Sequence, residues 1–434
     1  MEEQGKGKGL FGLIERIEGD KVIWMIVLML IMISVLCISS STPLLALQHK
    51  SSRGAIIYDQ VKVVAVGLAI IMFFYTFVKK IGVLRFFSKL GFFFSVGLLA
   101  MLAIRINLPI VKAEKINDAY RTLKIMGLQL HVFEFTKVFM VMYLAWAMQA
   151  YHENRLKLAD RLVKLGAKFM EKRIWRLYFY VFIPMLTVCI LTLTGGVSST
   201  LFTTLIMVVT VSIAGVKFKH LMGFAAVSLL CFSSAIGLYF ATDGKAFNRI
   251  GTAIERISKE HEESVDKLIT LNPKSKEYKE LRDKVKQPIS AKVAISEGGI
   301  FGKGPGGSTQ RYVVPIMFED YMFSFIVEEY GIVGALIVLI LYGSLLARCV
   351  ILVRNSNSSF TKTAIAGLAM MISGQAVMHM MINVDVGPLT GQTLPMISYG
   401  KASFVAFSMA FGIILAISRM IKRRKDELEQ IDNS

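Results

Sequence analysis

Cysteine is scarce in this 434-residue sequence, and the four that occur are not arranged for chemistry. Cys37, Cys189, Cys231 and Cys349 all lie in apolar runs, so their positions predict neither a disulfide framework nor a zinc site. His379 lies among methionines, with no second histidine or cysteine at ligand spacing. We therefore predict a buried core histidine and no metal site made by the protein.

Signatures for nucleotides and nucleic acids are also missing. The glycines at 298–307 contain no G-x-x-x-x-G-K-S/T motif and no βαβ unit encloses them, which argues against a P-loop. Lysine and arginine outnumber aspartate and glutamate by 50 to 31, but no aromatic-and-basic pattern accompanies the excess, so we expect no nucleic-acid partner. No small-residue cleavage site follows the first apolar run, 22–37, and we expect a membrane span there and not a cleaved signal.

Long uncharged runs are what the sequence has in excess. Mean hydropathy is +0.56, which is rare for a soluble domain, and a helix needs about 20 apolar residues to cross a bilayer. The pattern predicts an all-α polytopic membrane protein with about ten transmembrane helices. The expected spans are 22–42, 60–78, 91–108, 133–150, 175–194, 199–216, 220–241, 321–348, 363–384 and 402–419.

The distribution of lysine and arginine predicts the orientation of these spans. Basic clusters follow the second, fourth and sixth spans and fill the C-terminal tail, so all lie on one side if both termini are cytoplasmic. The expected organisation is then a cytoplasmic segment at 1–21, helices one to seven in 22–241, a large extracytoplasmic loop at 242–315, helices eight to ten in 316–420 and a cytoplasmic tail at 421–434.

Three connections between spans have patterns of their own. Residues 151–173 predict an amphipathic cytoplasmic helix, and residues 107–132 predict an outer loop. Within the large loop, residues 254–286 mix both signs of charge at helical spacing, and Pro273 divides them into two expected short helices. Such a pattern is typical of a solvated surface, so we expect no chemistry there.

The stretch Gln287–Gly331 concentrates the residues that could carry chemistry. Its glycines predict either a tight turn that re-enters the membrane or backbone N–H groups that face an anion, helped by Lys292, Lys303 and Arg311. A pyrophosphate would suit the second environment. The residues alone leave these alternatives even.

The acidic pair Glu319-Asp320 ends this loop and opens a membrane helix. Asp320 could cap the helix or, partly desolvated and near cations, act as a general base. The residues leave both readings open.

Glu134 and Lys137 are spaced i, i+3 in the fourth span, and we favour a buried salt bridge over catalysis for them. Residues 383–403 predict a polar hinge that could form a cavity wall, with Ser398 either lining or capping it.

The run AKVAISEGGIFGKGPGGSTQRYVVPIMFEDYMFSFIVEEYGIVGA resembles the signature of the SEDS (shape–elongation–division–sporulation) family. The usual form is a GG-x-x-G-x-G-x-G loop, a short S-x-Q-K/R, a proline, and an Asp that opens a helix containing Glu-Glu-F/L/Y-Gly. Residues 383–419, and Arg121 with Gly127, Glu134 and Lys137, resemble two further motifs. The likeness covers most of the chain, and its T-G-Q-T-L-P variant is closer to the FtsW branch of the family than to the RodA branch.

Several positions depart from the family pattern. His131-Val132-Phe133-Glu134 stands where QPSE is usual, Thr122 where a Trp follows the arginine, and SYGK, with Lys401, where SYGG is usual. The segment 195–200 lacks the usual acidic residue, and 315–320 keeps only the proline and the Asp of P-E-A-H-T-D. A divergent member with altered activity would show such changes.

The resemblance implies an inverting peptidoglycan glycosyltransferase that polymerises lipid II during cell division or elongation. It implies a multi-pass protein of the bacterial plasma membrane that works with a class B penicillin-binding protein (a transpeptidase) and with other membrane proteins of the division or elongation machinery. Asp320 would be the catalytic general base. The residues expected to bind substrate are Lys292, Lys303, Arg311, Arg121, Glu134, Lys137 and Ser398.

Two alternatives from other classes remain, a lipid II flippase or transporter and a non-catalytic division scaffold. A flippase needs the same groove and cations but no base, so Asp320 favours the enzyme. A divalent cation, Mg²⁺ or Mn²⁺, beside the pyrophosphate is compatible with the resemblance, although the sequence offers no cluster of ligands for it.

Overall fold

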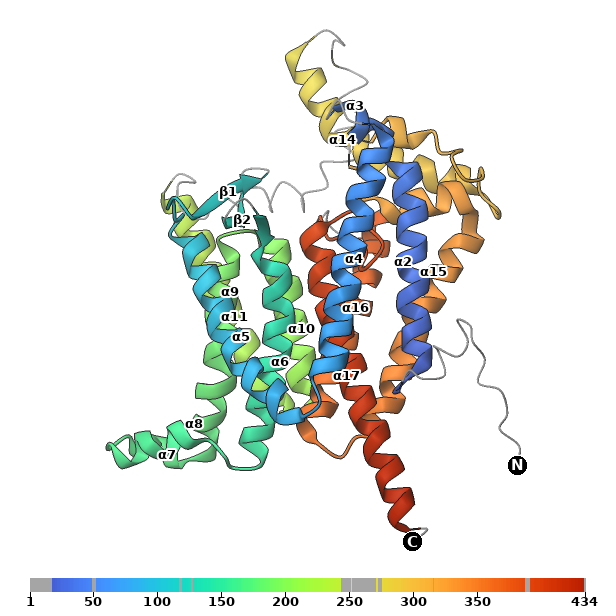
Figure 1. The fold of residues 1–434 in the computed structure, drawn as a ribbon. Coiled ribbons are helices and arrows are strands. Elements are labelled where there is room, and N and C mark those ends of the chain that lie inside the picture. Colours follow the sequence, from blue (N-terminus) through green and yellow to red (C-terminus); the bar gives the residue numbers. More distant parts are fainter. Residues whose placement is uncertain are drawn as a thin grey trace, which may run out of the picture.

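Long apolar helices that run side by side dominate the structure (Figure 1). This computed structural model describes residues 18–48, 52–116, 119–125, 128–242, 251, 271, 275–314, 316–386 and 391–432. The long helices are α2 (Lys21–Ser41), α4 (Arg53–Phe77), α5 (Ile81–Ala103), α6 (Val132–His152), α10 (Val197–Ile213), α11 (Phe218–Ala241), α15 (Met322–Arg354), α16 (Ser359–Asn383) and α17 (Lys401–Asp432).

The fifth predicted span is made of three consecutive segments. They are α8 (Arg173–Leu177), the π-helical turn η2 (Tyr178–Phe182) and α9 (Ile183–Leu193). Pro184 lies at the start of α9. Because proline has no N–H and its ring crowds the preceding turn, the wider π-helical turn occurs just before it.

Each predicted span overlaps one of these helical segments, which confirms the multi-pass helical fold. The third span was predicted too late in the chain, at 91–108, because α5 runs from Ile81 to Ala103. Within the described residues, eight helices are long and apolar enough to cross a membrane. Two segments fall short of that measure: α10 has only 17 residues, and α6 carries Glu134 and Lys137. The count of ten spans therefore stays a prediction.

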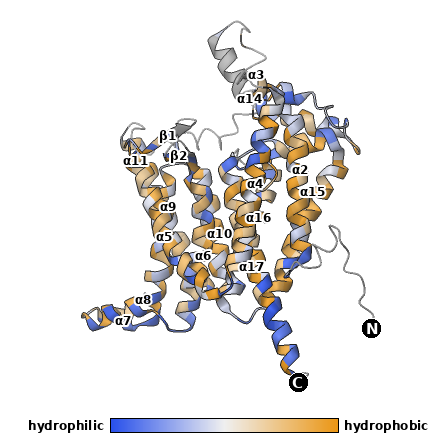
Figure 2. Ribbon diagram, viewed as in Figure 1, coloured by the Kyte–Doolittle hydropathy of each residue, from blue (hydrophilic) through white to orange (hydrophobic). Residues whose placement is uncertain are grey.

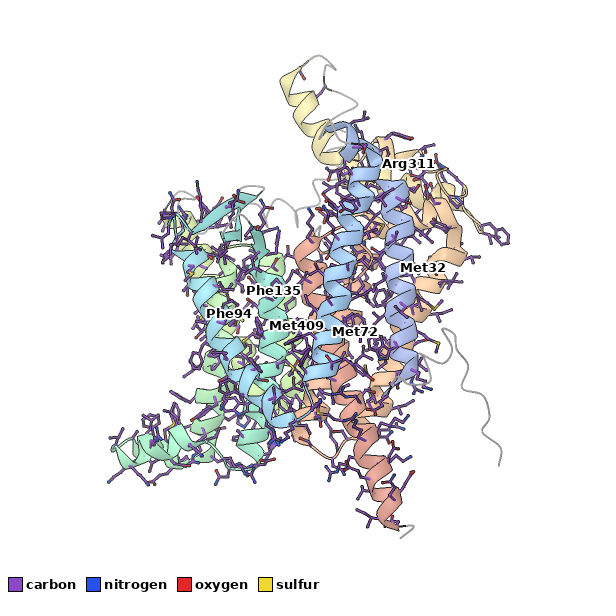
Figure 3. The ribbon with its side chains drawn as sticks, viewed as in Figure 1. Met32, Met72, Phe94, Phe135, Arg311 and Met409 are labelled. Atoms are coloured by element: carbon purple, nitrogen blue, oxygen red, sulfur yellow. The ribbon has the colours of Figure 1, made fainter. Side chains whose placement is uncertain are left out.

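Two hydrophobic clusters hold the helices together. The first is formed mainly by α2, α4, α15, α16 and α17, and the second by α5, α6, α9 and α10. Helix α6 contributes to both clusters and contacts α10, α16 and α17, so it joins the two groups. The outward faces are apolar as well (Figure 2): Met32 and Phe94, labelled in Figure 3, are 55% and 51% exposed. A lipid bilayer would cover such a surface.

The two ends of the bundle carry different structures (Figure 1). One end has the short helices α7 (Lys157–Lys164) and α8, together with the beginning of α2 and the end of α17. The other end has α3 (Pro43–Gln48), α14 (Lys276–Gly298), the 3₁₀ turn η3 (Gln310–Tyr312) and a small sheet. The predicted amphipathic helix at 151–173 is instead broken into α7, the 3₁₀ turn η1 (Lys168–Glu171) and the start of α8.

The predicted outer loop at 107–132 is an antiparallel sheet of β1 (Val111–Ile116), β2 (Ala119–Ile125) and β3 (Leu128–His131), in that order. The alternation of apolar and polar residues in these strands is short and is interrupted by charged residues, so the sequence did not predict them. Leu123 is fully buried, whereas Glu114 on the neighbouring strand reaches Lys124 at 3.2 Å and Gln129 at 2.8 Å. The fold is therefore helical with one small sheet added.

The large loop before the eighth span is also more ordered than predicted. Its last part forms α14, a 23-residue helix that contacts α15 and contains Pro288. The division of 254–286 at Pro273 is only partly testable, because most of that segment lies outside the described residues; the described helix does begin after Pro273, at Lys276.

Helix α15 is broken at Gly331, where φ is 66° and ψ is −166°. The loop after α14 replaces the lost helical hydrogen bonds. The N–H groups of Lys303 and Gly304 donate to the carbonyls of Glu328 and Glu329, each at 2.9 Å. In return, the N–H of Ile332 donates to the carbonyl of Gly299 at 3.0 Å. Backbone hydrogen bonds thus join the glycine-rich loop to a membrane helix, because buried backbone N–H and C=O groups need partners.

Two glycines of this loop provide a test of the close approach. Gly302 and Gly304 have φ of +77° and +84°, but a Cβ on Gly302 would lie 2.3 Å from the Glu329 carbonyl, whereas one on Gly304 meets nothing within 4 Å. We expect Gly304→Ala to cost about 1 kcal/mol of backbone strain. Gly302→Ala should cost about 1–3 kcal/mol more, because it also forces a steric clash. Thermal unfolding in detergent measures both, and equal losses would contradict the close approach.

Candidate functional site

Asp320 lies in a tight turn that leads into α15. The N–H groups of Glu319 and Asp320 both donate to the carbonyl of Ile316, at 3.0 and 3.1 Å. Asn383 of α16 donates from Nδ2 to the carbonyl of Asp320 at 3.0 Å. The helix begins at Met322 with Tyr321 as its N-cap, so Asp320 is not the capping residue, which was one alternative for it.

The segment 391–400, between α16 and α17, forms a wall beside this turn. Tyr399 donates its N–H to the carbonyl of Phe318 at 2.9 Å. Ser398 Oγ accepts from the N–H of Leu394 and donates to the carbonyl of Glu319, at 2.9 and 2.8 Å. Ser398 is buried and therefore positions the turn. The Asp320 carboxylate itself lies beside Gly391, where a Cβ would be 3.5 Å from Asp320 Oδ2.

A buried ammonium group lies on the other side of this wall. Lys137 Nζ, on α6, contacts Glu134 Oε1 at 2.9 Å, Gln375 Oε1 at 2.5 Å and Gln392 Oε1 at 3.4 Å. Its side chain is 3% exposed, and it also lies over the rings of Phe202 and Phe407. The predicted Glu134–Lys137 ion pair is present.

Gln392 connects this pair to Asp320. It follows Gly391, where an added Cβ would lie 3.5 Å from the Asp320 carboxylate, and its side chain reaches Lys137. The network also extends to α17, because Ser403 Oγ shares a hydrogen bond with Thr393 Oγ1 at 2.7 Å. One short segment therefore lies beside the predicted base and also contacts a buried cation.

His379 fixes the same segment from within α16. Its Nδ1 donates to the carbonyl of Gln392 at 2.7 Å, and its Nε2 accepts from the N–H of Phe323 at 3.3 Å. A carbonyl can only accept and an N–H can only donate, so these partners fix the neutral imidazole with its proton on Nδ1. His379 is the predicted core histidine, and the structure adds that it orders the wall of the site.

Glu328 and Glu329 are fully buried in the turn before the break in α15. Glu328 accepts from Lys303 Nζ, from Ser308 Oγ at 2.5 Å and from the N–H of Thr309 at 2.8 Å. Glu329 accepts from Ser40 Oγ of α2 at 2.6 Å and from the N–H of Gly306 at 3.0 Å. The carboxylates of Glu328 and Glu329 thus hold the loop at residues 303–309, and we call this set of contacts the loop clamp.

The clamp changes the interpretation of two predicted substrate-binding residues. Lys303 lies 2.8 Å from Glu328 Oε1 and also pairs with Glu297. Arg311, labelled in Figure 3 at the end of the bundle, lies 3.4 Å from Glu329 Oε1 and donates to Ser40 and to the carbonyl of Gly306. Both cations neutralise protein carboxylates. These contacts agree with the alternative of a tight, re-entrant turn, and a role for Lys303 and Arg311 in substrate binding stays a prediction.

The two remaining predicted cations lie elsewhere around the site. Lys292 extends from α14 to Asp385, just after α16, at 2.5 Å, and both side chains are about half exposed. Arg121, on β2, donates from Nε to the carbonyl of Gly195 at 2.9 Å and lies against Gly196. Gly195 and Gly196 belong to the α9–α10 connection that lacks the family's usual acidic residue, so Arg121 reaches a backbone carbonyl there.

Sequence reasoning missed Gln375 and Gln392. Uncharged amides at isolated positions give no signal unless a partner such as Lys137 is known to face them. In the described part of the chain, no three His, Cys, Asp or Glu side chains gather as a metal site. The Mg²⁺ or Mn²⁺ ion stays a prediction, and no step of the chemistry below is assigned to it.

Glu319, beside Asp320 and outside the membrane spans, is a much weaker acid than an ordinary glutamate. Burial, together with the neighbouring Asp320 carboxylate, raises its pKa to about 8. At neutral pH Glu319 therefore holds a proton next to the predicted base. Its position corresponds to the threonine of the usual family motif, so this protonated neighbour is a feature of this chain.

Comparison with known proteins gives one family. The model of the cell cycle protein family of FtsW, RodA and SpoVE matches residues 20–423. The probable peptidoglycan glycosyltransferase FtsW of Caulobacter vibrioides is 25% identical over 335 residues, which are 77% of this chain and 73% of that protein. The protein with the same name from Lactococcus lactis is 26% identical over 69% of this chain and 68% of its own.

Solved structures show the same fold. A chain from a study of how a peptidoglycan synthase complex coordinates polymerization and crosslinking aligns with a TM-score of 0.65 at 21% identity, over 93% of this chain and 98% of its own. The Rod shape determining protein RodA of Thermus thermophilus aligns with a TM-score of 0.57 at 19% identity, with the same coverage.

The acidity of Glu319 predicts a pH dependence of stability. An unfolded chain would release this proton above a pKa of about 4.5, whereas the folded protein keeps it to about 8, so unfolding becomes easier as pH rises through this window. The slope is at most about 1.4 kcal/mol per pH unit. Glu319→Gln should remove this part of the decline in unfolding temperature between pH 5 and 8. The exposed control Glu427→Gln should keep it; matching slopes in all three proteins would refute the assignment.

The buried pair predicts a large asymmetry between single and double substitutions. Lys137→Met leaves Glu134 buried without its cation and should cost about 3–5 kcal/mol. Adding Glu134→Gln should recover part of that loss, because no unpaired charge then remains. The control is Lys62→Met, which breaks an exposed i, i+3 pair with Asp59 and should cost less than about 1 kcal/mol. Thermal unfolding of the purified proteins decides; similar losses for Lys137→Met and Lys62→Met would contradict the network.

Proposed function

Because this chain belongs to the FtsW, RodA and SpoVE family of cell cycle proteins, we propose that it is a peptidoglycan glycosyltransferase that polymerises lipid II. The names of its relatives support this reaction. The observation that supports a catalytic residue for this reaction is the position of Asp320. Its carboxylate sits at the end of the bundle beside Gly391. The turn that carries it is held by the side chains of Asn383, on α16, and Ser398, which donate to the main-chain carbonyls of Asp320 and Glu319.

In the proposed reaction Asp320 is the general base. It takes the proton from the acceptor's sugar hydroxyl while that oxygen forms a bond to the anomeric carbon of the donor. The bond from this carbon to the lipid pyrophosphate breaks in the same step, with inversion, and the pyrophosphate leaves with the bonding electrons. The rigid turn around Asp320 would hold the base in place, which lowers the cost of reaching the transition state.

The leaving pyrophosphate needs positive charge nearby. Among the predicted cations, Lys292 is the best placed to supply it, because its side chain is about half exposed and its ion-pair partner among the described residues, Asp385, is half exposed too. Arg121 is the second candidate, on the sheet at the same end of the molecule. Lys303 and Arg311 are assigned to the loop clamp, and Glu134, Lys137 and Ser398 are assigned to positioning the wall beside Asp320.

The same proposal includes the surroundings of the enzyme. We place the protein in the bacterial plasma membrane with both termini cytoplasmic, which follows the positive-inside rule and leaves Asp320 on the outer side. The synthase complex whose chain shares this fold supports a class B penicillin-binding protein as partner. Other proteins of the division or elongation machinery remain expected partners.

Replacement of the base tests the reaction. Asp320→Asn keeps the shape but removes the proton acceptor, so glycan formation from lipid II by purified protein with a class B penicillin-binding protein should fall by about 100-fold or more. The matched control is Asp59→Asn, an exposed carboxylate on α4 paired with Lys62, which should leave polymerisation unchanged.

The outcome separates the alternatives. Unchanged glycan synthesis by Asp320→Asn, in a protein with normal unfolding temperature, would refute the general base. If the wild-type protein moves labelled lipid II across vesicles and makes no glycan, it is a transporter. If it does neither while binding its partner, it is a scaffold.

A further inference from the structure

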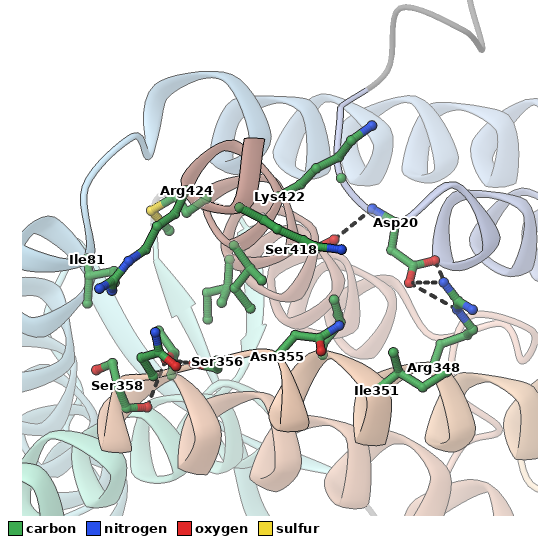
Figure 4. A pocket seen from close by; sticks show the side chains of 18 of the residues that line it. Asp20, Ile81, Arg348, Ile351, Asn355, Ser356, Ser358, Ser418, Lys422 and Arg424 are labelled. Carbon is green, nitrogen blue, oxygen red and sulfur yellow. Dashed lines mark hydrogen bonds and ion pairs between the residues drawn. The ribbon is translucent and has the colours of Figure 1, made fainter. Parts of the chain in front are cut away.

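A cavity of about 500 Å³ opens at the end of the bundle opposite Asp320. It lies between the beginning of α2, the α15–α16 turn and the extension of α17 (Figure 4). These elements end or begin a membrane span at this level, so the cavity sits at the boundary between the apolar belt and the solvent. The reaction proposed above makes no use of it.

The cavity has a surplus of positive charge. Its lining includes five cations, Lys21, Arg348, Lys422, Arg424 and Lys425, and one acid, Asp20. Asp20 already neutralises Arg348, with Arg348 Nη2 2.7 Å from Asp20 Oδ2, and it accepts from the N–H groups at the start of α2.

Four of these cations therefore remain for a ligand. Lys425 has only an exposed partner, Glu429, at 3.5 Å, and such pairs contribute little. Among the described residues, Lys21, Lys422 and Arg424 form no ion pair or hydrogen bond. In Figure 4, Lys422 and Arg424 extend from α17 over the cavity, with Arg424 toward Ile81. The lining of the cavity thus has a surplus of positive charge that favours an anionic ligand.

The walls of the cavity are apolar, which narrows the kind of anion. On α17, Ile417, Ile421, Arg424 and Leu428 are spaced by three or four residues, so apolar and cationic side chains share one helix face. Leu428 is 51% exposed and Ile351, across the cavity on α15, is 42% exposed. A hydrated inorganic ion makes no favourable contact with apolar side chains. A phospholipid does, because the acyl chains attached to its headgroup can pack against them.

We propose that this cavity binds the phosphate headgroup of an anionic phospholipid. The phosphate lies among Lys21, Lys422 and Arg424, and the acyl chains lie along Ile351 and the neighbouring apolar belt. Basic pockets between helices at a membrane surface recognise such headgroups through this combination. The bound lipid would add to the Asp20–Arg348 ion pair and the Asp20–Ser418 hydrogen bond, which already join α2 to α15 and α17 at this level.

The experiment measures retention of 1-palmitoyl-2-oleoyl phosphatidylglycerol by the purified full chain in detergent, using native mass spectrometry. Each cation near an anionic headgroup contributes about fivefold, so Lys422→Gln with Arg424→Gln should weaken retention about 30-fold. The matched control, Lys217→Gln with Lys219→Gln, removes the same charge from exposed lysines at the start of α11 and should retain the lipid. Phosphatidylcholine should show no difference among the three proteins.

Two further arms identify the source of the phosphate. Glycerol 1-phosphate at the same concentration should not displace the lipid, and Ile351→Ser should weaken retention of phosphatidylglycerol. Equal retention by the cavity and control variants would overturn the proposal, and full displacement by glycerol 1-phosphate would assign the cavity to a soluble phosphate. If the double variant has a lowered unfolding temperature, Lys21→Gln alone should still weaken retention about fivefold, and an unchanged value would refute the site.

Discussion

Two fully buried carboxylates, those of Glu328 and Glu329, determine the arrangement of the end of the bundle that carries Asp320. A buried charge is tolerated only with partners, and these two glutamates obtain theirs from Ser40 of α2, from Lys303 and Arg311, and from backbone N–H groups of the loop. The break at Gly331 adds free carbonyls in the same place. These contacts hold the loop in its observed conformation, and the turn that carries Asp320 follows directly from its end.

The membrane fold was largely predictable, because the bilayer demands apolar runs of known length. Each predicted span has its helix, and the positions of the basic clusters suggest the sidedness. What could not be predicted depends on pairing between distant residues. The strands at 111–131 are too short and too charged to show alternation. The helix α14 runs across the predicted boundary at residue 286, and its later residues Ala291 and Ala294 are buried.

The candidate site was predictable in its residues and less so in their roles. Asp320 and the pair Glu134–Lys137 were identified from type and spacing, and the structure connects them through Gln392. The sequence left two alternatives for Lys303 and Arg311, because a glycine-rich, cationic loop looks the same whether its charges face a substrate or a buried glutamate. Only the fold shows that Lys303 pairs with Glu328, 25 residues later in the chain, and Arg311 with Glu329, 18 residues later.

The tautomer of His379 has a consequence for where protons can go. Both ring nitrogens are committed to backbone groups, so this histidine cannot pass a proton between Asp320 and the membrane interior. Lys137 is likewise enclosed by amide and carboxylate oxygens. A proton collected by Asp320 would thus return to the water on its own side. Under the proposed reaction, each sugar addition would neither use nor dissipate the proton gradient across the membrane.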